Sequence, residues 1–168
     1  IFSPLCRPLF FFSNEVALQM EKHTLLQICV HDQYGFEPVI RFQSWRIAMS
    51  NAMVDERAVE LSRHMETDES FVLLHGECTL LVVDSDETYG SVHAVRMCQQ
   101  VVYNVPKGVW HTHLMKANTK LLIVENEDTG AVNSQRMDLS PEEGVRLERL
   151  AAKAADSLES IYSTVQRG

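Results

Sequence analysis

From Arg63 to Glu77 the chain reads RHMETDESFVLLHGE, and this stretch decides how the rest of the sequence is interpreted. The apolar run from Phe71 to Leu74, ended by Gly76, predicts a strand, and the polar residues before it predict a turn. His64 and Glu69 are therefore expected to face each other across a hairpin. Opposed residues on paired strands have Cβ atoms ~4.5–5.5 Å apart, which lets an imidazole and a carboxylate share one metal ion.

Short strands are predicted on both sides of this stretch. The segment from Val59 to His64 forms the preceding strand, with Ser62 and His64 on one face, because side chains alternate along a strand. Other segments rich in apolar and β-branched residues are 39–53, 79–83, 91–97, 101–105, 109–114 and 121–124. A polar hairpin loop over residues 84–90 joins segments 79–83 and 91–97, and Pro106-Lys107-Gly108 forms a turn before segment 109–114. Such a series predicts an all-β sandwich or barrel.

A helix is predicted after the strands. Ser140 is suited to the N-cap, Pro141 to the first helical position, and Glu143 closes a capping box with Ser140. Apolar residues at intervals of three and four from Leu147 to Val165 form one stripe along this helix. The stripe packs either against the barrel of its own chain or against a second subunit.

The chain is predicted to be one domain in three segments, because 168 residues fit the ~100–200 of a single domain. Residues 1–38 form an N-terminal extension that is expected to pack on the barrel, with a helix-compatible run around Glu15–Met20. Residues 39–138 form the barrel, and residues 139–168 carry the C-terminal helix.

Composition excludes several classes of partner. Hydrophobic residues make up 45% and charged residues 23%, as in globular proteins, and the net charge of −8 disfavours nucleic acid and anionic membranes. No segment has the ~20 apolar residues of a membrane span, and no signal-peptide pattern is found, so we expect a cytoplasmic protein. The cysteines Cys6, Cys29, Cys78 and Cys98 form no metal-binding or redox motif and are expected to be free thiols.

The sequence resembles the cupin superfamily over roughly residues 42–126. Cupins carry a first motif G-x(5)-H-x-H-x(3,4)-E-x(6)-G, to which His64, Glu69 and Gly76 correspond with the expected spacing. In their second motif, G-x(5)-P-x-G-x(2)-H-x(3)-N, the matching residues are Pro106, Gly108 and His111. The resemblance implies a double-stranded β-helix, or jelly-roll barrel, here with an added C-terminal α-helix.

Four motif positions are occupied by other residues. Ser62 stands at the first histidine, Glu56 and Gln100 at the two opening glycines, and Met115 at the closing asparagine. Cupins usually bind a metal through three histidines and one glutamate. The resemblance therefore implies that a divalent transition metal (iron, manganese, nickel or zinc) is bound here by the three ligands that remain, His64, Glu69 and His111. Two histidines and one carboxylate are a recognised ligand set for non-haem iron.

Other residues are candidates for the cavity wall. His111 and His113 share a strand face ~6.6 Å apart, so His113 becomes a fourth ligand only if the strand bulges. Otherwise it lines the cavity deeper in the barrel and binds substrate, water or a core partner. Ser62 is expected to project into the same cavity. Trp45 and Phe71 belong either to the core or to the substrate-binding wall.

Two functions remain open at this stage. The first is a metal-dependent enzyme acting on a small molecule, with a reaction that the sequence does not define. The second is a non-catalytic cupin that binds or senses a small ligand at a degenerate metal site, which the replacements Ser62 and Met115 favour. In both cases we expect a homodimer.

Overall fold

The computed structural model describes residues 21–23, 26–84 and 91–154. Residues 1–30 form one unit and residues 31–168 another. In the first unit, β1 (Glu21–His23) and β2 (Leu26–Ile28) form an antiparallel hairpin. The predicted helix at Glu15–Met20 lies outside the described residues. Packing of residues 1–38 on the barrel remains a prediction.

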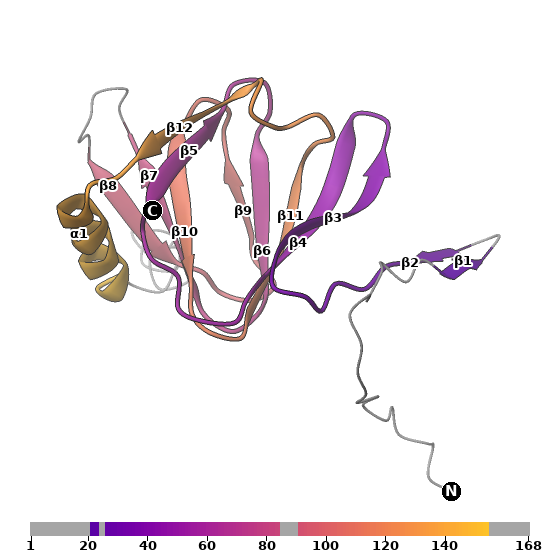
Figure 1. The fold of residues 1–168 in the computed structure, drawn as a ribbon, viewed down its shortest axis with the longest axis horizontal. Coiled ribbons are helices and arrows are strands. Elements are labelled where there is room, and N and C mark those ends of the chain that lie inside the picture. The colour runs from indigo at the N-terminus through magenta and orange to yellow at the C-terminus, as the bar shows by residue number, and fades with distance from the viewer. Residues whose placement is uncertain (1–20, 24–25, 85–90, 155–168) are drawn as a thin grey trace, which may run out of the picture. The chain divides into compact units, whose positions relative to one another are not determined.

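The second unit contains two five-stranded antiparallel sheets (Figure 1). The first has the order β3 (Gly35–Phe42), β4 (Trp45–Ala52), β11 (Thr119–Asn126), β6 (Glu69–His75), β9 (Val102–Val105). The second has the order β12 (Ser134–Asp138), β5 (Glu60–His64), β10 (Trp110–Met115), β7 (Cys78–Val83), β8 (Val92–Arg96).

The strand order is that of a jelly roll. From β4 to β7 each strand lies in the opposite sheet from the one before it, and the chain alternates again from β8 to β11. Among the strands from β4 to β11, only β7 and β8 are consecutive in the chain and also paired with each other. The sequence predicted this hairpin for the segments on either side of residues 84–90. Eight strands arranged as two such Greek keys define the jelly-roll architecture, so the predicted all-β barrel is confirmed.

One local prediction was wrong. His64 ends β5 and Glu69 begins β6, but these strands belong to different sheets and do not form a hairpin. The connection over residues 65–68 instead carries the chain from one sheet to the other. The two side chains therefore meet across the barrel interior.

The core lies between the two sheets. Phe71, Leu121 and Ile123 of the first sheet are almost fully buried, as are Cys78 and Met115 of the second. Burying an aliphatic or aromatic side chain of this size contributes roughly 1.5–3 kcal/mol, so this layer holds the sheets together. The thiols of Cys29 and Cys78 are free, as expected, and Cys6 lies outside the described residues.

Two glycines fix turns of the barrel, Gly108 next to His64 and Gly76 at the opposite end of β6 from Glu69. Gly76 has φ of 84°, and a Cβ there would lie 2.5 Å from Thr119 Oγ1 and 2.7 Å from Thr119 Cα. Gly108 has φ of 79° with open space around it, and its N–H donates to the carbonyl of His64 at 2.7 Å. Glycine adopts positive φ without steric cost, so both matches to the cupin motifs have a conformational reason.

Helix α1 (Pro141–Ala152) begins with the predicted capping box between Ser140 and Glu143. Leu147 and Ala151 are buried in a cluster with residues of the second sheet, so the helix packs against its own barrel. Figure 1 shows it beside β8. The helix ends at Ala152 with Lys153 as C-cap, and the rest of the predicted stripe falls in residues 155–168, outside the described residues. No helix in the described ranges is long and apolar enough to cross a membrane.

Candidate metal centre

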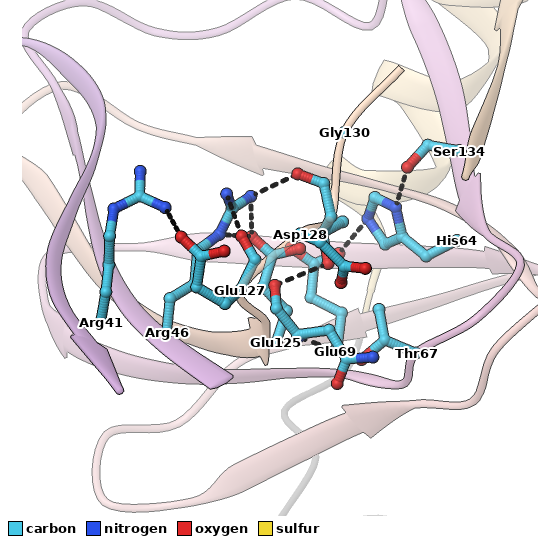
Figure 2. Close-up of polar contacts among 12 residues, drawn as sticks. Arg41, Arg46, His64, Thr67, Glu69, Glu125, Glu127, Asp128, Gly130 and Ser134 are labelled. Carbon is cyan, nitrogen blue, oxygen red and sulfur yellow. Dashed lines mark hydrogen bonds and ion pairs between the residues drawn. The ribbon is translucent and has the colours of Figure 1, made fainter. Parts of the chain in front are cut away.

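Three side chains from three strands converge at one end of the barrel interior. Glu69 Oε2 lies 3.0 Å from His64 Nε2 and 2.8 Å from His111 Nε2. One potential ligand atom from each residue falls within 4.8 Å of the others. Figure 2 shows His64 pointing towards Glu69 from one side and towards Ser134 from the other.

The connection between β5 and β6 is held in place on several sides. Met65 N–H donates to the carbonyl of Asn133, and the Thr67 hydroxyl accepts from Asn126 N–H. The Asp68 carboxylate accepts from Lys107 N–H at 2.9 Å, next to the turn that contains Gly108. These bonds tie the two motif segments together and position His64 against Glu69.

Hydrogen bonds define how the imidazoles are oriented. His111 Nδ1 lies 2.9 Å from the carbonyl of Val109, which requires the proton on Nδ1. A neutral His111 then presents the lone pair of Nε2 to a carboxylate oxygen 2.8 Å away, so a proton or a cation must lie between them. Metal-binding histidines commonly donate their second N–H to a backbone carbonyl in this way, so the donor set fits a metal ion.

Electrostatics also favour a positive charge here. Burial raises the pKa of the Glu69 carboxyl, but hydrogen bonds from His111 and His64 outweigh it and lower the pKa to about 2. For His64, burial lowers the pKa while the hydrogen bond and charge of Glu69 raise it, and the net shift is upward. Glu69 is thus a buried carboxylate that stays ionised.

A buried ion pair stands beside this group (Figure 2). Arg46 Nη2 lies 2.8 Å from Glu125 Oε1, and the guanidinium also donates to the carbonyls of Glu127 and Thr129. Burial and the charge of Glu69 raise the pKa of Glu125, which Arg46 partly offsets. Arg46 thereby holds Glu125 on the cavity wall.

The site opens into a cavity of about 260 Å³, whose walls include Ser62, His113, Arg46, Glu125, Thr129 and Arg136. A larger hollow of about 310 Å³ lies beside α1. Several of its charged groups neutralise one another, since Lys116 pairs with Asp55 and Arg57 with Glu148. The barrel cavity, which contains His64, Glu69 and His111, is therefore the better candidate for a functional site.

The other predicted cavity residues divide into two groups. Ser62 pairs with His111 across β5 and β10 and lines the cavity, and Phe71 is fully buried with its ring edge-on to His111. Trp45 lies apart from them, 38% exposed beside Phe42.

His113 lies further along β10 than His111. Its ring contacts Phe71, and it is outside the three-residue group. Burial lowers the pKa of His113, which favours a neutral ring.

Residues that differ from the cupin motifs still support the local backbone structure of the barrel. Gln100 has φ of 65°, the left-handed conformation for which the motif uses glycine. Glu56 and Met115 pair with each other, because Glu56 N–H donates to the Met115 carbonyl and Met115 N–H donates to Glu56 Oε2. The barrel is therefore maintained despite these replacements.

Sequence reasoning missed Ser134, Arg46 and Glu125. Glu125 had a signal, because alternation along β11 places Leu121, Ile123 and Glu125 on the same inward face. A carboxylate on an otherwise apolar inward face indicates a functional position. Ser134 contacts His64 from a strand 70 positions later and had no comparable signal.

No family model and no curated protein matches the sequence. Several solved structures resemble this fold. On its strand order the chain has the jelly-roll fold, and the site residues lie at positions that match the cupin motifs.

A cupin-2 domain protein of Shewanella frigidimarina is 20% identical, with a TM-score of 0.41 over 58% of this chain and 85% of its own. A cupin superfamily protein of Desulfitobacterium hafniense is 17% identical, with a TM-score of 0.46 over 66% and 95%. The Streptomyces nucleoside dehydratase Pac13 is 8% identical, with a TM-score of 0.48 over 67% and 86%. At these identities the likeness concerns the fold alone.

Proposed function

We propose that His64, Glu69 and His111 bind one divalent transition metal ion and that the cavity beside it binds a small molecule. The proposal rests on one observation: the Nε2 atoms of His64 and His111 both lie within hydrogen-bond distance of Glu69 Oε2. His111 Nδ1 meanwhile donates to the carbonyl of Val109. Two imidazoles and a carboxylate suit iron(II), manganese, nickel or zinc.

A bound ion would supply a Lewis acid with coordination positions open to a small molecule. The chain's own residues would orient that molecule. The Ser62 hydroxyl lines the cavity and forms no hydrogen bond within the described part of the chain, which leaves it available. The ring nitrogens of His113 are likewise without a hydrogen bond there, while Phe71 fixes the ring. Both groups can donate to or accept from a polar ligand.

A second candidate is a non-catalytic cupin that binds a ligand without a metal. The observation in its favour is that Glu69 lies within hydrogen-bond distance of both His64 Nε2 and His111 Nε2. The three side chains can therefore bond to one another without a metal ion. Ser62, which stands at a usual ligand position, agrees with this alternative. The two candidates differ in metal content.

Metal content is tested on protein purified without added metal or chelator. Elemental analysis is expected to give one transition ion per chain for the parent and for His75→Ala, which changes an exposed histidine outside the site. His111→Ala is expected to lose it. Equal metal content in the two variants, or no metal in the parent even after calorimetric titration with the four ions, supports the second candidate.

A further inference from the structure

One carboxylate on the barrel wall takes no part in the candidate metal centre. Glu125 lies on the inward side of β11, in line with the core residues Leu121 and Ile123, and it is 5% exposed. It lines the same cavity as the three candidate ligands. A carboxylate is rarely buried unless it is paired, so its partners and its unused bonding capacity indicate what it can bind.

The two oxygens of Glu125 have different surroundings. Arg46, directly opposite on β4, donates to Oε1 from Nε at 3.0 Å and from Nη2 at 2.8 Å (Figure 2). Oε2 accepts no hydrogen bond within the described part of the chain, and it is not among the fully buried atoms that lack a partner. It therefore keeps accessible surface on the cavity wall. An ionised carboxylate only accepts hydrogen bonds, so Oε2 is open to a donor from a ligand.

The arginines of the cavity wall are already paired. Nη2 of Arg46 also donates to the carbonyl of Thr129, and Nη1 donates to that of Glu127, so most of its N–H groups are occupied. The second arginine, Arg136, lies 3.4 Å from Glu60 Oε1. Among the cavity-wall residues that the structure describes, each guanidinium thus has its charge balanced by a carboxylate.

We propose that Glu125 selects the ligand, and that this ligand is a small neutral polyhydroxy compound with one hydroxyl donating to Glu125 Oε2. The inference rests on the proposed function, in which an oxygen of the same molecule binds the ion. Such a compound also suits Ser62 and His113, whose polar groups can both donate and accept. A cavity of about 260 Å³ is smaller than the ~300–1,000 Å³ of sites for drug-sized ligands, so it suits a molecule the size of one sugar.

Other ligand chemistries fit this wall less well. A carboxylate or phosphate turned towards Glu125 Oε2 would be repelled by it, and the described wall offers no unbalanced arginine to offset that repulsion. An ammonium group could donate to Oε2, but the divalent ion in the same cavity would repel it. A hydroxyl donates without adding charge. A ligand that lacks this hydroxyl leaves a desolvated acceptor unpaired, which weakens its binding.

The experiment measures binding of glucose, xylitol and myo-inositol to the metal-loaded full chain by calorimetric titration. At least one of them is expected to bind the parent, and at least one monodeoxy analogue of that compound to bind tenfold more weakly. In Glu125→Gln the amide oxygen can accept from Arg46, which turns the NH2 group towards the cavity. The polyol should then bind at least tenfold more weakly, and removing the same hydroxyl should make little further difference.

The matched control is Glu127→Gln, because the Glu127 side chain pairs with Arg41 outside the cavity. It should bind the polyol like the parent. If Glu125→Gln does not fold, Arg46→Met with Glu125→Met replaces the buried pair by apolar residues, a change that proteins often tolerate. Binding should fall there too, and polyol binding at the parent's affinity would overturn the proposal.

Metal content, measured on every sample, separates this inference from the proposed function. A parent that takes up no ion overturns the proposed function, and the inference with it. A parent that holds the ion but binds none of the three compounds overturns the inference alone. Tighter binding of glucose 6-phosphate than of glucose, or equal affinity of the parent and Glu125→Gln, does the same. Loss of the ion from Glu125→Gln also overturns it, because Glu125 would then act through the metal site.

Discussion

Ser62 is the residue whose replacement changes the site most. It lies directly opposite His111, at the position where cupins usually have a metal-binding histidine. Ser62→His should add an imidazole to the set and tighten metal binding by about tenfold or more, about 1.4 kcal/mol. Calorimetric titration of the apoprotein measures this, with Ser70→His on the outward side of β6 as control. Equal affinity for Ser62→His and the parent would show that the residue does not reach the ion.

Glu69 makes the stability of the metal-free protein depend on acid. Its pKa is about 2 in the folded state and 4.5 as its ordinary value. The folded state therefore binds this proton less readily, so the stabilisation is present above pH 4.5 and is lost as the pH falls towards 2. The contribution is of order 3 kcal/mol.

Glu69→Gln removes this titration. Urea unfolding of parent and variant, both with chelator, should give stabilities that converge as the pH falls through this window. A difference that stays constant with pH would contradict the assignment.

The resemblance to the two cupin motifs was enough to predict the three residues that meet at the candidate centre. His64, Glu69 and His111 follow fixed intervals from the glycines and proline that shape the turns. Arg46 and Ser134 were beyond prediction, because their positions depend on which distant strands become neighbours. The hydrogen bond from Ser134 to His64 exists only because β12 pairs with β5.

At the scale of elements, the turn at Gly76 can be compared with the turn at Gly108. Both glycines have positive φ, but only at Gly76 would a Cβ collide with backbone and side chain of Thr119. Gly108→Ala should cost roughly 1–2 kcal/mol for the left-handed conformation alone. Gly76→Ala should cost clearly more, because Thr119 at the start of β11 must also move. Thermal unfolding of the two variants tests this, and equal losses would contradict it.

Helix α1 offers a test in which propensity and packing have opposite effects. Alanine is about 1 kcal/mol more favourable than glycine inside a helix. At Gly144, however, a Cβ would lie 2.4 Å from the Ala58 carbonyl oxygen. Gly144→Ala should therefore destabilise the protein by roughly 1–3 kcal/mol. Arg149→Ala, on the exposed side of α1, should stay within about 0.5 kcal/mol. A higher melting temperature for Gly144→Ala would mean that α1 does not dock as described.

The elements themselves were largely predictable, while their partners were not. Segments rich in apolar and β-branched residues indicated β6 and β10, and the capping box indicated α1. The hairpin expected between β5 and β6 was wrong, since a polar turn of four residues can either reverse the chain within a sheet or carry it across to the opposite sheet. Only the completed jelly roll distinguishes these outcomes.

At the scale of the whole molecule, the inward and outward sides of the two sheets have different roles. Their inward sides provide the core and, at one end, the candidate metal centre with its cavity. Their outward sides differ, because α1 packs against the second sheet, whereas outward residues of the first sheet such as Val102 and Phe42 are exposed. The resemblance to cupins predicted the first arrangement. The second emerged only from strand register, because outward residues such as Val72 and Leu122 are indistinguishable from core residues in the sequence.

The most direct test of the central claim is anomalous X-ray diffraction from crystals of the protein loaded with zinc or nickel, recorded at the absorption edge of the metal. A single strong peak is predicted within bonding distance, roughly 2.0–2.2 Å, of His64 Nε2, His111 Nε2 and a carboxylate oxygen of Glu69. A peak at other residues, or loaded crystals in which these three side chains still bond directly to one another without an ion, would contradict it.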